Sequence, residues 1–162
     1  MRRIRPLATG ALVATLVTAV LTPTASVAQS PEHDAALSVI TTLFDGMRSR
    51  DTSAMRAAFA PGAALQSVGP AGQLRADPID GWIGSVASAP AGLVLDERLG
   101  PPIIQLRGNL ATVWVDYWFF AGDRFSHCGV DAFVLGKIDG TWRILSVADT
   151  RQREGCPPAP GH

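Results

Sequence analysis

The side chains best suited to acid–base chemistry lie between positions 116 and 131: Asp116, His127 and Asp131. Histidine titrates near neutral pH, so His127 can act as general base or general acid. Asp131 or Asp116 would orient the imidazole, or serve as a carboxylic acid whose pKa is raised by apolar surroundings. This set suits isomerisation, dehydration or aldol-type cyclisation, none of which needs a metal or cofactor. A buried structural pair of His127 with an aspartate is the alternative, and the sequence leaves both open.

Four large aromatic residues accompany these groups, and we expect them to line a pocket for a small, fairly apolar molecule: Trp82, Trp114, Trp118 and Phe133. Packing in the core is the alternative for each of them. The chain has no P-loop, dinucleotide fingerprint or GxSxG elbow that would indicate another reaction class. Our first hypothesis is a pocket protein that binds without catalysis. A cofactor-independent enzyme is the second, and a dimeric interaction domain without a ligand is the third.

The two cysteines, Cys128 and Cys156, predict a disulfide if the chain is exported, because disulfides persist in oxidising compartments. A metal site of His127 with both cysteines lacks the usual ligand spacing, so we expect no metal. Asp149 and Arg151 have the same strand parity, and we expect them to pair beside the disulfide.

Three helices are expected before residue 92. Ser30-Pro31 is typical of an N-cap followed by the first helical residue, and an apolar stripe at helical spacing continues to Met47. Asp51 predicts a second cap, for a short helix that includes Phe59 and stops at Pro61. Asp77-Pro78 predicts the start of a third helix, which Pro90 ends.

From residue 92 onward the apolar residues alternate, which predicts strands at about 92–98, 102–107, 110–120, 125–138 and 141–151. A small hairpin is expected over 63–68 and 73–75. Three two-residue turns join the later strands: Gly108-Asn109, Gly122-Asp123 and Asp139-Gly140. Helices followed by a meander of strands predict an α+β fold with the helices packed on one face of an antiparallel sheet.

The turns also predict which side chains share a face of the sheet. With regular pairing, Trp118 opposes His127 and Asp131 opposes Ala148. All the candidate site residues of the two central strands would then share one face: Trp114, Asp116, Trp118, His127, Asp131 and Phe133. A β-bulge would shift this assignment.

The sequence resembles the nuclear transport factor 2-like superfamily, and within it exported bacterial members of the SnoaL-like and lumazine-binding-like groups. The resemblance rests on the three-helix and meander layout, the hairpin from Asp139 to Ile144, and the segments 126–133 and 149–151. It implies a cone-shaped curved antiparallel sheet closed by three N-terminal helices around a pocket. It also implies a homodimer formed through the outer face of the sheet. Isomerases, dehydratases, cyclases and non-catalytic binders share this fold. No residue indicates a pteridine site.

Residues 1–28 are predicted to be a cleavable signal peptide, since Arg2, Arg3 and Arg5 precede an uncharged stretch and Ser26 and Ala28 suit signal peptidase. The chain has 14 basic and 14 acidic residues, so losing the three arginines leaves a net charge of −3. Nucleic acid and anionic membranes are therefore not expected partners. We expect one domain over 29–156, an irregular tail over 157–162, and a periplasmic or secreted location.

Overall fold

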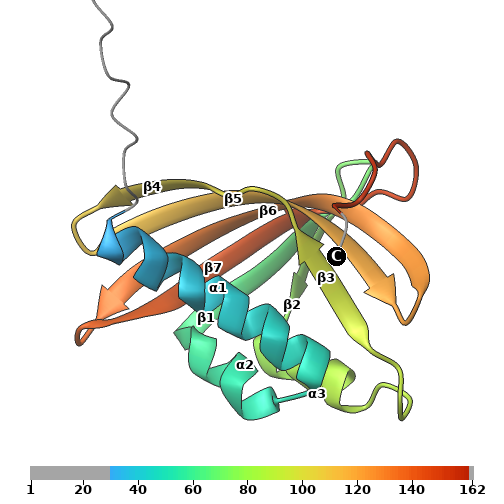
Figure 1. The fold of residues 1–162 in the computed structure, drawn as a ribbon, viewed down its shortest axis with the longest axis horizontal. Helices are drawn as coiled ribbons and strands as arrows, with labels where there is room; N and C mark the ends of the chain where they lie inside the picture. The colour runs from blue at the N-terminus through green and yellow to red at the C-terminus, as the bar shows by residue number, and fades with distance from the viewer. Residues whose placement is uncertain (1–29, 161–162) are drawn as a thin grey trace, which may run out of the picture.

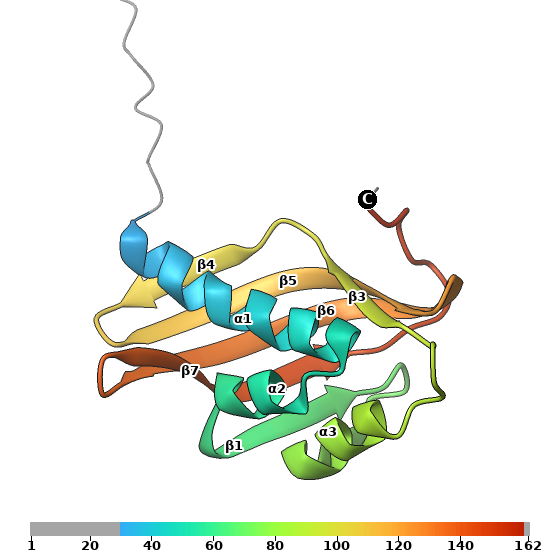
Figure 2. The same cartoon turned by 60° about the horizontal axis from the view of Figure 1, so that its bottom comes forward.

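The computed structural model describes residues 30–160; the predicted signal peptide lies outside the described residues. Three helices lie on one face of a curved, seven-stranded sheet that does not close into a barrel (Figures 1 and 2). The predicted α+β class is therefore confirmed. Among the helices of residues 30–160, none has the length and apolar character needed to cross a membrane.

The helices begin at the predicted caps in two of three cases. Helix α1 (Pro31–Ser49) starts after Ser30, whose side chain accepts a hydrogen bond from the His33 amide. Helix α2 (Thr52–Ala58) starts after Asp51, which accepts from two backbone amides at 2.9 and 3.0 Å. Helix α3 (Ile79–Ala87) differs, because Pro78 occupies the N-cap position in place of Asp77. Asp77 belongs instead to the preceding strand.

Seven strands make one sheet: β1 (Phe59–Val68), β2 (Leu74–Asp77), β3 (Leu95–Leu99), β4 (Ile103–Arg107), β5 (Leu110–Ala121), β6 (Arg124–Ile138) and β7 (Thr141–Thr150). Their order is β2-β1-β7-β6-β5-β3. In addition, β4 pairs with the N-terminal half of β5. The expectation of a purely antiparallel sheet is wrong, since β1 and β7 pair in parallel. Phe59, expected in the second helix, is instead the first residue of β1. Pro61 disfavours helical backbone at Ala60, and the helix ends at Ala58.

The three predicted two-residue turns are present, with Arg107 opposite Leu110, Ala121 opposite Arg124 and Ile138 opposite Thr141. Beyond the turns, however, two irregularities shift the register. Between β5 and β6, Phe120 pairs with Phe125 and Phe119 with His127, so Ser126 is an extra residue and Trp118 faces Cys128.

The second irregularity lies between β6 and β7, where Leu145 is the extra residue. Asp131 consequently faces Asp149, and the predicted pairing with Ala148 is wrong. Because side chains alternate along a strand, each bulge moves the following residues to the opposite face.

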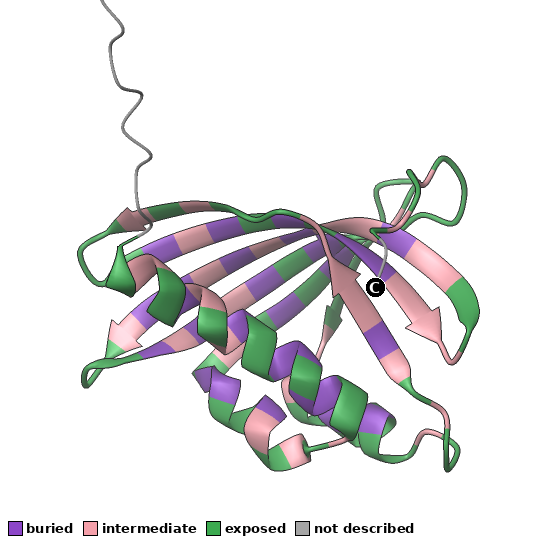
Figure 3. Ribbon diagram, in the orientation of Figure 1, coloured by how far each residue is buried: buried purple, intermediate pink, exposed green. Residues whose placement is uncertain are grey.

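The predicted grouping of site residues on one face is therefore also wrong. His127, Asp131 and Phe133 face the helices, whereas Trp114, Asp116 and Trp118 lie on the outer face. Along the central strands buried and more exposed residues alternate (Figure 3). Between the helices and the inner face lies the core, which includes Leu43, Phe44, Ile83, Val113, Val115, Phe133 and Ile144.

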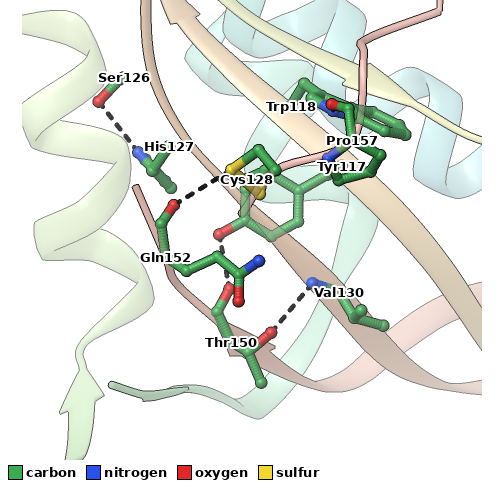
Figure 4. The surroundings of a disulfide bond; sticks show 10 residues. Tyr117, Trp118, Ser126, His127, Cys128, Val130, Thr150, Gln152 and Pro157 are labelled. Atoms are coloured by element: carbon green, nitrogen blue, oxygen red, sulfur yellow. Dashed lines mark hydrogen bonds between the residues drawn. A yellow bond between two sulfur atoms is a disulfide. The ribbon is translucent and has the colours of Figure 1, made fainter. Parts of the chain in front are cut away.

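After β7 the chain turns back over the end of the sheet as a segment that we call the strap, residues 151–160. Cys156 in the strap forms the predicted disulfide with Cys128 on β6. Gln152 and Cys128 exchange two backbone hydrogen bonds of 2.9 Å, and the Trp118 indole donates to the Pro157 carbonyl at 2.8 Å. The strap thus covers Trp118, which is 7% exposed, on the outer face (Figure 4).

Glycine is required at position 129, where the end of β7 crosses β6. A Cβ atom there would lie 1.8 Å from the Thr150 carbonyl oxygen and 2.8 Å from the Tyr117 ring. The Tyr117 hydroxyl donates to the same carbonyl at 2.8 Å, which holds the crossing in place.

Gly129→Ala is expected to destabilise the protein by about 3 kcal/mol or more, because backbone rather than a flexible side chain must move. Urea unfolding measures the change. Gly84→Ala in α3 is the control: a Cβ at 84 meets nothing within 4 Å, so stability should be unchanged or slightly increased. Equal stabilities for the two variants would contradict this account of the crossing.

Candidate functional site

A cavity of about 410 Å³ opens between α3, β2 and the inner face of the sheet. Trp82 from α3 and Phe119 from β5 form aromatic walls, and Leu95 and Val86 add apolar surface. His127 and Arg151 line the same cavity, and so does Arg75, which lies 3.7 Å from Asp77. The cavity therefore has apolar sides and a polar rim.

A smaller recess of about 40 Å³ adjoins this cavity, and both share Trp82, Glu97 and Arg151. Asp131 and Asp149 line the recess, together with the apolar side chains of Phe133 and other core residues. We call the four ionisable residues here the floor: Glu97, Asp131, Asp149 and Arg151.

Strand pairing brings the floor together. Asp131 of β6 lies opposite Asp149 of β7, and the two are 3% and 8% exposed. Arg151, two residues beyond Asp149, donates from Nε to Asp149 Oδ2 at 2.9 Å. Two buried oxygens of the floor, Asp131 Oδ2 and Asp149 Oδ1, have no hydrogen-bond partner within residues 30–160.

The floor has three carboxyl groups and a single guanidinium. Ionising all three carboxyl groups away from water would cost a large electrostatic free energy. Burial raises the pKa of Asp131 to about 7, and the neighbouring charge of Asp149 adds to that effect while Glu97 and Arg151 oppose it. Burial also raises the pKa of Glu97 well above its ordinary value, and the adjacent Asp131 raises it further. Glu97 and Asp131 are therefore placed to share a proton near neutral pH.

His127 sits near the floor but remains uncharged. Its ring contacts Tyr117 edge-on, with centroids 5.6 Å apart, and Phe119 at 5.0 Å. Burial, followed by the positive charge of Arg151, lowers the pKa of His127 to about 4. Its Nδ1 is 3.0 Å from Ser126 Oγ (Figure 4). At neutral pH this imidazole can accept or donate a hydrogen bond at the cavity wall without carrying charge.

Residues 31–148 match a protein family described as "Putative lumazine-binding". The chain belongs to this family. No curated protein matches it at a significant level.

Solved structures described as nuclear transport factor 2-like (NTF2-like) share the fold of this lumazine-binding-family member. An NTF2-like protein of unknown function from Shewanella baltica is 21% identical, covering 76% of this chain and 95% of its own, with a TM-score of 0.61. One from Silicibacter pomeroyi is 24% identical over 75% and 97% of the two chains, with a TM-score of 0.56. A protein of unknown function with a cystatin-like fold from Nostoc punctiforme is 14% identical over 77% and 95%, with a TM-score of 0.61. At these identities the neighbours establish the fold.

In this family member the predicted site residues are divided between two faces. Trp82 and Phe133 line the cavity and its recess, and His127 and Asp131 lie there too. The remaining three do not join them. Trp114 is 55% exposed on the outer face, Asp116 is exposed beside it, and Trp118 packs under the strap.

Sequence reasoning missed Glu97 and Phe119 as cavity residues and assigned Asp149 and Arg151 only a local pairing. A signal for Glu97 was present, because it stands between Leu95 and Leu99 at the inward parity of a short strand. A charged residue at a core-facing position is uncommon unless it is paired or functional. Within residues 30–160, no three His, Cys, Asp or Glu side chains are arranged to hold a metal ion.

The raised pKa of Asp131 predicts a pH-dependent stability. Between its ordinary pKa near 4 and its folded value of about 7, the folded state holds a proton that the unfolded chain releases. Asp131 therefore lowers stability progressively as pH rises through this window.

Asp131→Asn removes this contribution, so the free energy of unfolding of the variant minus that of the wild type should increase from pH 4 to pH 7. An increase on the order of 2–4 kcal/mol corresponds to the shift. Urea unfolding at several pH values measures it. A difference that stays constant with pH, or decreases, would contradict the raised pKa.

Proposed function

We propose that the protein binds a small, flat, partly apolar molecule in the cavity beneath α3, with hydrogen-bond donors of the ligand directed to the floor. The observation that carries the proposal is a pair of buried oxygens without partners, Asp131 Oδ2 and Asp149 Oδ1, on residues that line the small recess beside the cavity. Buried acceptors without partners are costly, and a ligand that supplies donors removes that cost.

Shape and size support this proposal. A volume of about 410 Å³ falls in the range of small-molecule sites, roughly 300–1,000 Å³. Trp82 and Phe119 offer flat surfaces on which a ring can pack. The family description names lumazine, a flat bicycle with N–H donors and carbonyl acceptors, which is one molecule of this kind.

An acid–base enzyme is the second candidate, favoured by one feature: burial raises the pKa of Asp131 to about 7 beside Glu97, whose pKa is also raised. Such a group can remove a proton from a carbon next to a carbonyl and return it elsewhere. His127, neutral at the cavity wall, would donate a hydrogen bond to the carbonyl oxygen. Asp116 has no part in this version because it lies on the outer face.

Two further expectations accompany the proposal. A homodimer through the outer face would cover Trp114 and Ile103, which are 55% and 66% exposed and opposite one another on β5 and β4. A periplasmic or secreted location agrees with the disulfide, which is typical of oxidising compartments.

Ser85→Trp tests the binding proposal, since Ser85 lines the cavity from α3 and an indole there would fill it. The wild type should bind 2-naphthol, a flat fluorescent probe with one O–H donor, and the variant should bind at least about tenfold more weakly. Gly84→Trp, at the exposed neighbouring position, is the matched control and should bind like the wild type. The absence of 2-naphthol binding to the wild type, or equal affinity in all three proteins, would contradict the proposal.

Cyclohex-3-en-1-one tests the enzyme candidate. Transfer of a proton from C2 to C4 gives the conjugated ketone, which is followed by its ultraviolet absorbance. The wild type should accelerate this conversion over buffer, and Asp131→Asn should lose about 100-fold or more of the rate while still binding 2-naphthol. No acceleration by the wild type, or full activity of Asp131→Asn, would argue against catalysis by the floor.

A further inference from the structure

Three unpartnered polar atoms lie in one row across neighbouring strands. Ser67 of β1 pairs in register with Asp149 of β7, and Asp149 pairs with Asp131 of β6. All three residues are buried, at 4%, 8% and 3% exposure. Ser67 Oγ, Asp149 Oδ1 and Asp131 Oδ2 have no hydrogen-bond partner among the described residues. Two of the three are carboxylate-type acceptors that face the recess.

The charge of the floor favours a donor that is positive or can become positive. Arg151 is already paired with Asp149 through Nε. A single proton shared by Glu97 and Asp131 leaves one negative charge between them. His127 does not balance it, because burial and Arg151 keep its pKa low. A ligand group that donates two hydrogen bonds and carries a positive charge would give the free oxygens partners. It would also neutralise the remaining negative charge of the floor.

The sizes of the two spaces restrict that group further. The recess of about 40 Å³ is about a tenth of the main cavity of about 410 Å³, so a projecting amino group suits the recess and a ring suits the cavity. The larger cavity has room for the ring, and Trp82 and Phe119 line it. Donors that project from one edge of a flat ring fit both spaces at once.

We propose that the ligand is a flat nitrogen heterocycle with an amidine-type edge, an amino group beside a ring nitrogen, which binds the free carboxyl oxygens of Asp131 and Asp149. This inference rests on the proposed binding function and names the class of molecule that the cavity takes. The two neighbouring N–H groups of such an edge can each donate to one of these oxygens, one on Asp131 and one on Asp149, and a negative charge on the acceptor strengthens the bond. A carbonyl at the same ring position presents an acceptor to an acceptor and is disfavoured.

Pterin and lumazine form a matched pair for the test, because they share the bicycle and differ in an amino group against a carbonyl at position 2. Isothermal titration of the wild type at pH 7 is expected to show pterin binding at least about tenfold more tightly than lumazine. The pair 2-aminobenzimidazole and benzimidazol-2-one should show the same order. Both comparisons use unaltered protein and so do not depend on whether a variant folds.

Variants then locate the preference. In Asp131→Asn the advantage of pterin over lumazine should fall to within about threefold, because the amide lacks the negative charge and one acceptor. Asp139→Asn, in the exposed turn between β6 and β7, should retain the full advantage. A pterin preference that persists in Asp131→Asn would overturn the assignment to the floor.

The outcomes separate the two proposals. If 2-naphthol binds but neither amino compound binds more tightly than its oxo partner, the amidine inference is overturned and cavity binding stands. If 2-naphthol and all four heterocycles fail to bind to the wild type, both are overturned.

Discussion

Asp131 and Asp149 face each other across β6 and β7 inside the fold, and their negative charges would repel each other. Much of the local structure reduces this repulsion. Like charges at paired positions of an antiparallel ladder destabilise it, and burial strengthens the effect. Two interactions reduce the repulsion. Arg151 neutralises Asp149 through a direct hydrogen bond, and Asp131 retains its proton up to about pH 7 beside Glu97. A sheet selected for stability alone would place apolar residues at both positions, and this cost is part of the basis for the proposed binding site.

The hydrogen bond from Arg151 to Asp149 depends on the strap. Arg151 follows the last residue of β7, and an unattached chain end would hold it poorly. Gly129 lets the Thr150 backbone approach β6, Tyr117 fixes the Thr150 carbonyl, and Gln152 pairs with Cys128 on the other side of Arg151. The guanidinium is thus held from both ends of its backbone. The pocket is completed by a segment whose own contacts lie mostly on the outer face of the sheet.

Most of the fold could be predicted because its signals are local. Capping residues set the starts of α1 and α2, and glycine or aspartate at positive φ set the three tight turns. The parallel pairing of β1 with β7 could not be predicted, since no local pattern records which distant strand becomes a neighbour. The faces of β5 and β6 were assigned wrongly for a different reason. Ser126 and Leu145 look like ordinary strand residues, and nothing nearby indicates that each is left out of the ladder.

The bulge at Ser126 determines how much of the site could be predicted. His127, Asp131 and Phe133 follow Ser126 and remained together, so one strand of the site was correctly grouped. Trp114, Asp116 and Trp118 precede it on β5 and were placed on the wrong side as a set. Glu97 and Arg151 reach the floor from an edge strand and from the strap. Their proximity depends on the sheet's curvature and on the crossing at Gly129, which are properties of the whole fold.

The Cys128–Cys156 bond has a practical consequence for anyone who handles this protein. Cys156 lies five positions after Arg151, so a thiol reductant in the buffer acts on the pocket without touching it. Once the bond opens, the strap regains conformational freedom and Arg151 spends less time beside Asp149. The floor then loses part of the positive charge that Arg151 supplies to it. We therefore expect the position of Arg151 in the pocket to depend on the redox state of a bond on the opposite face of the sheet.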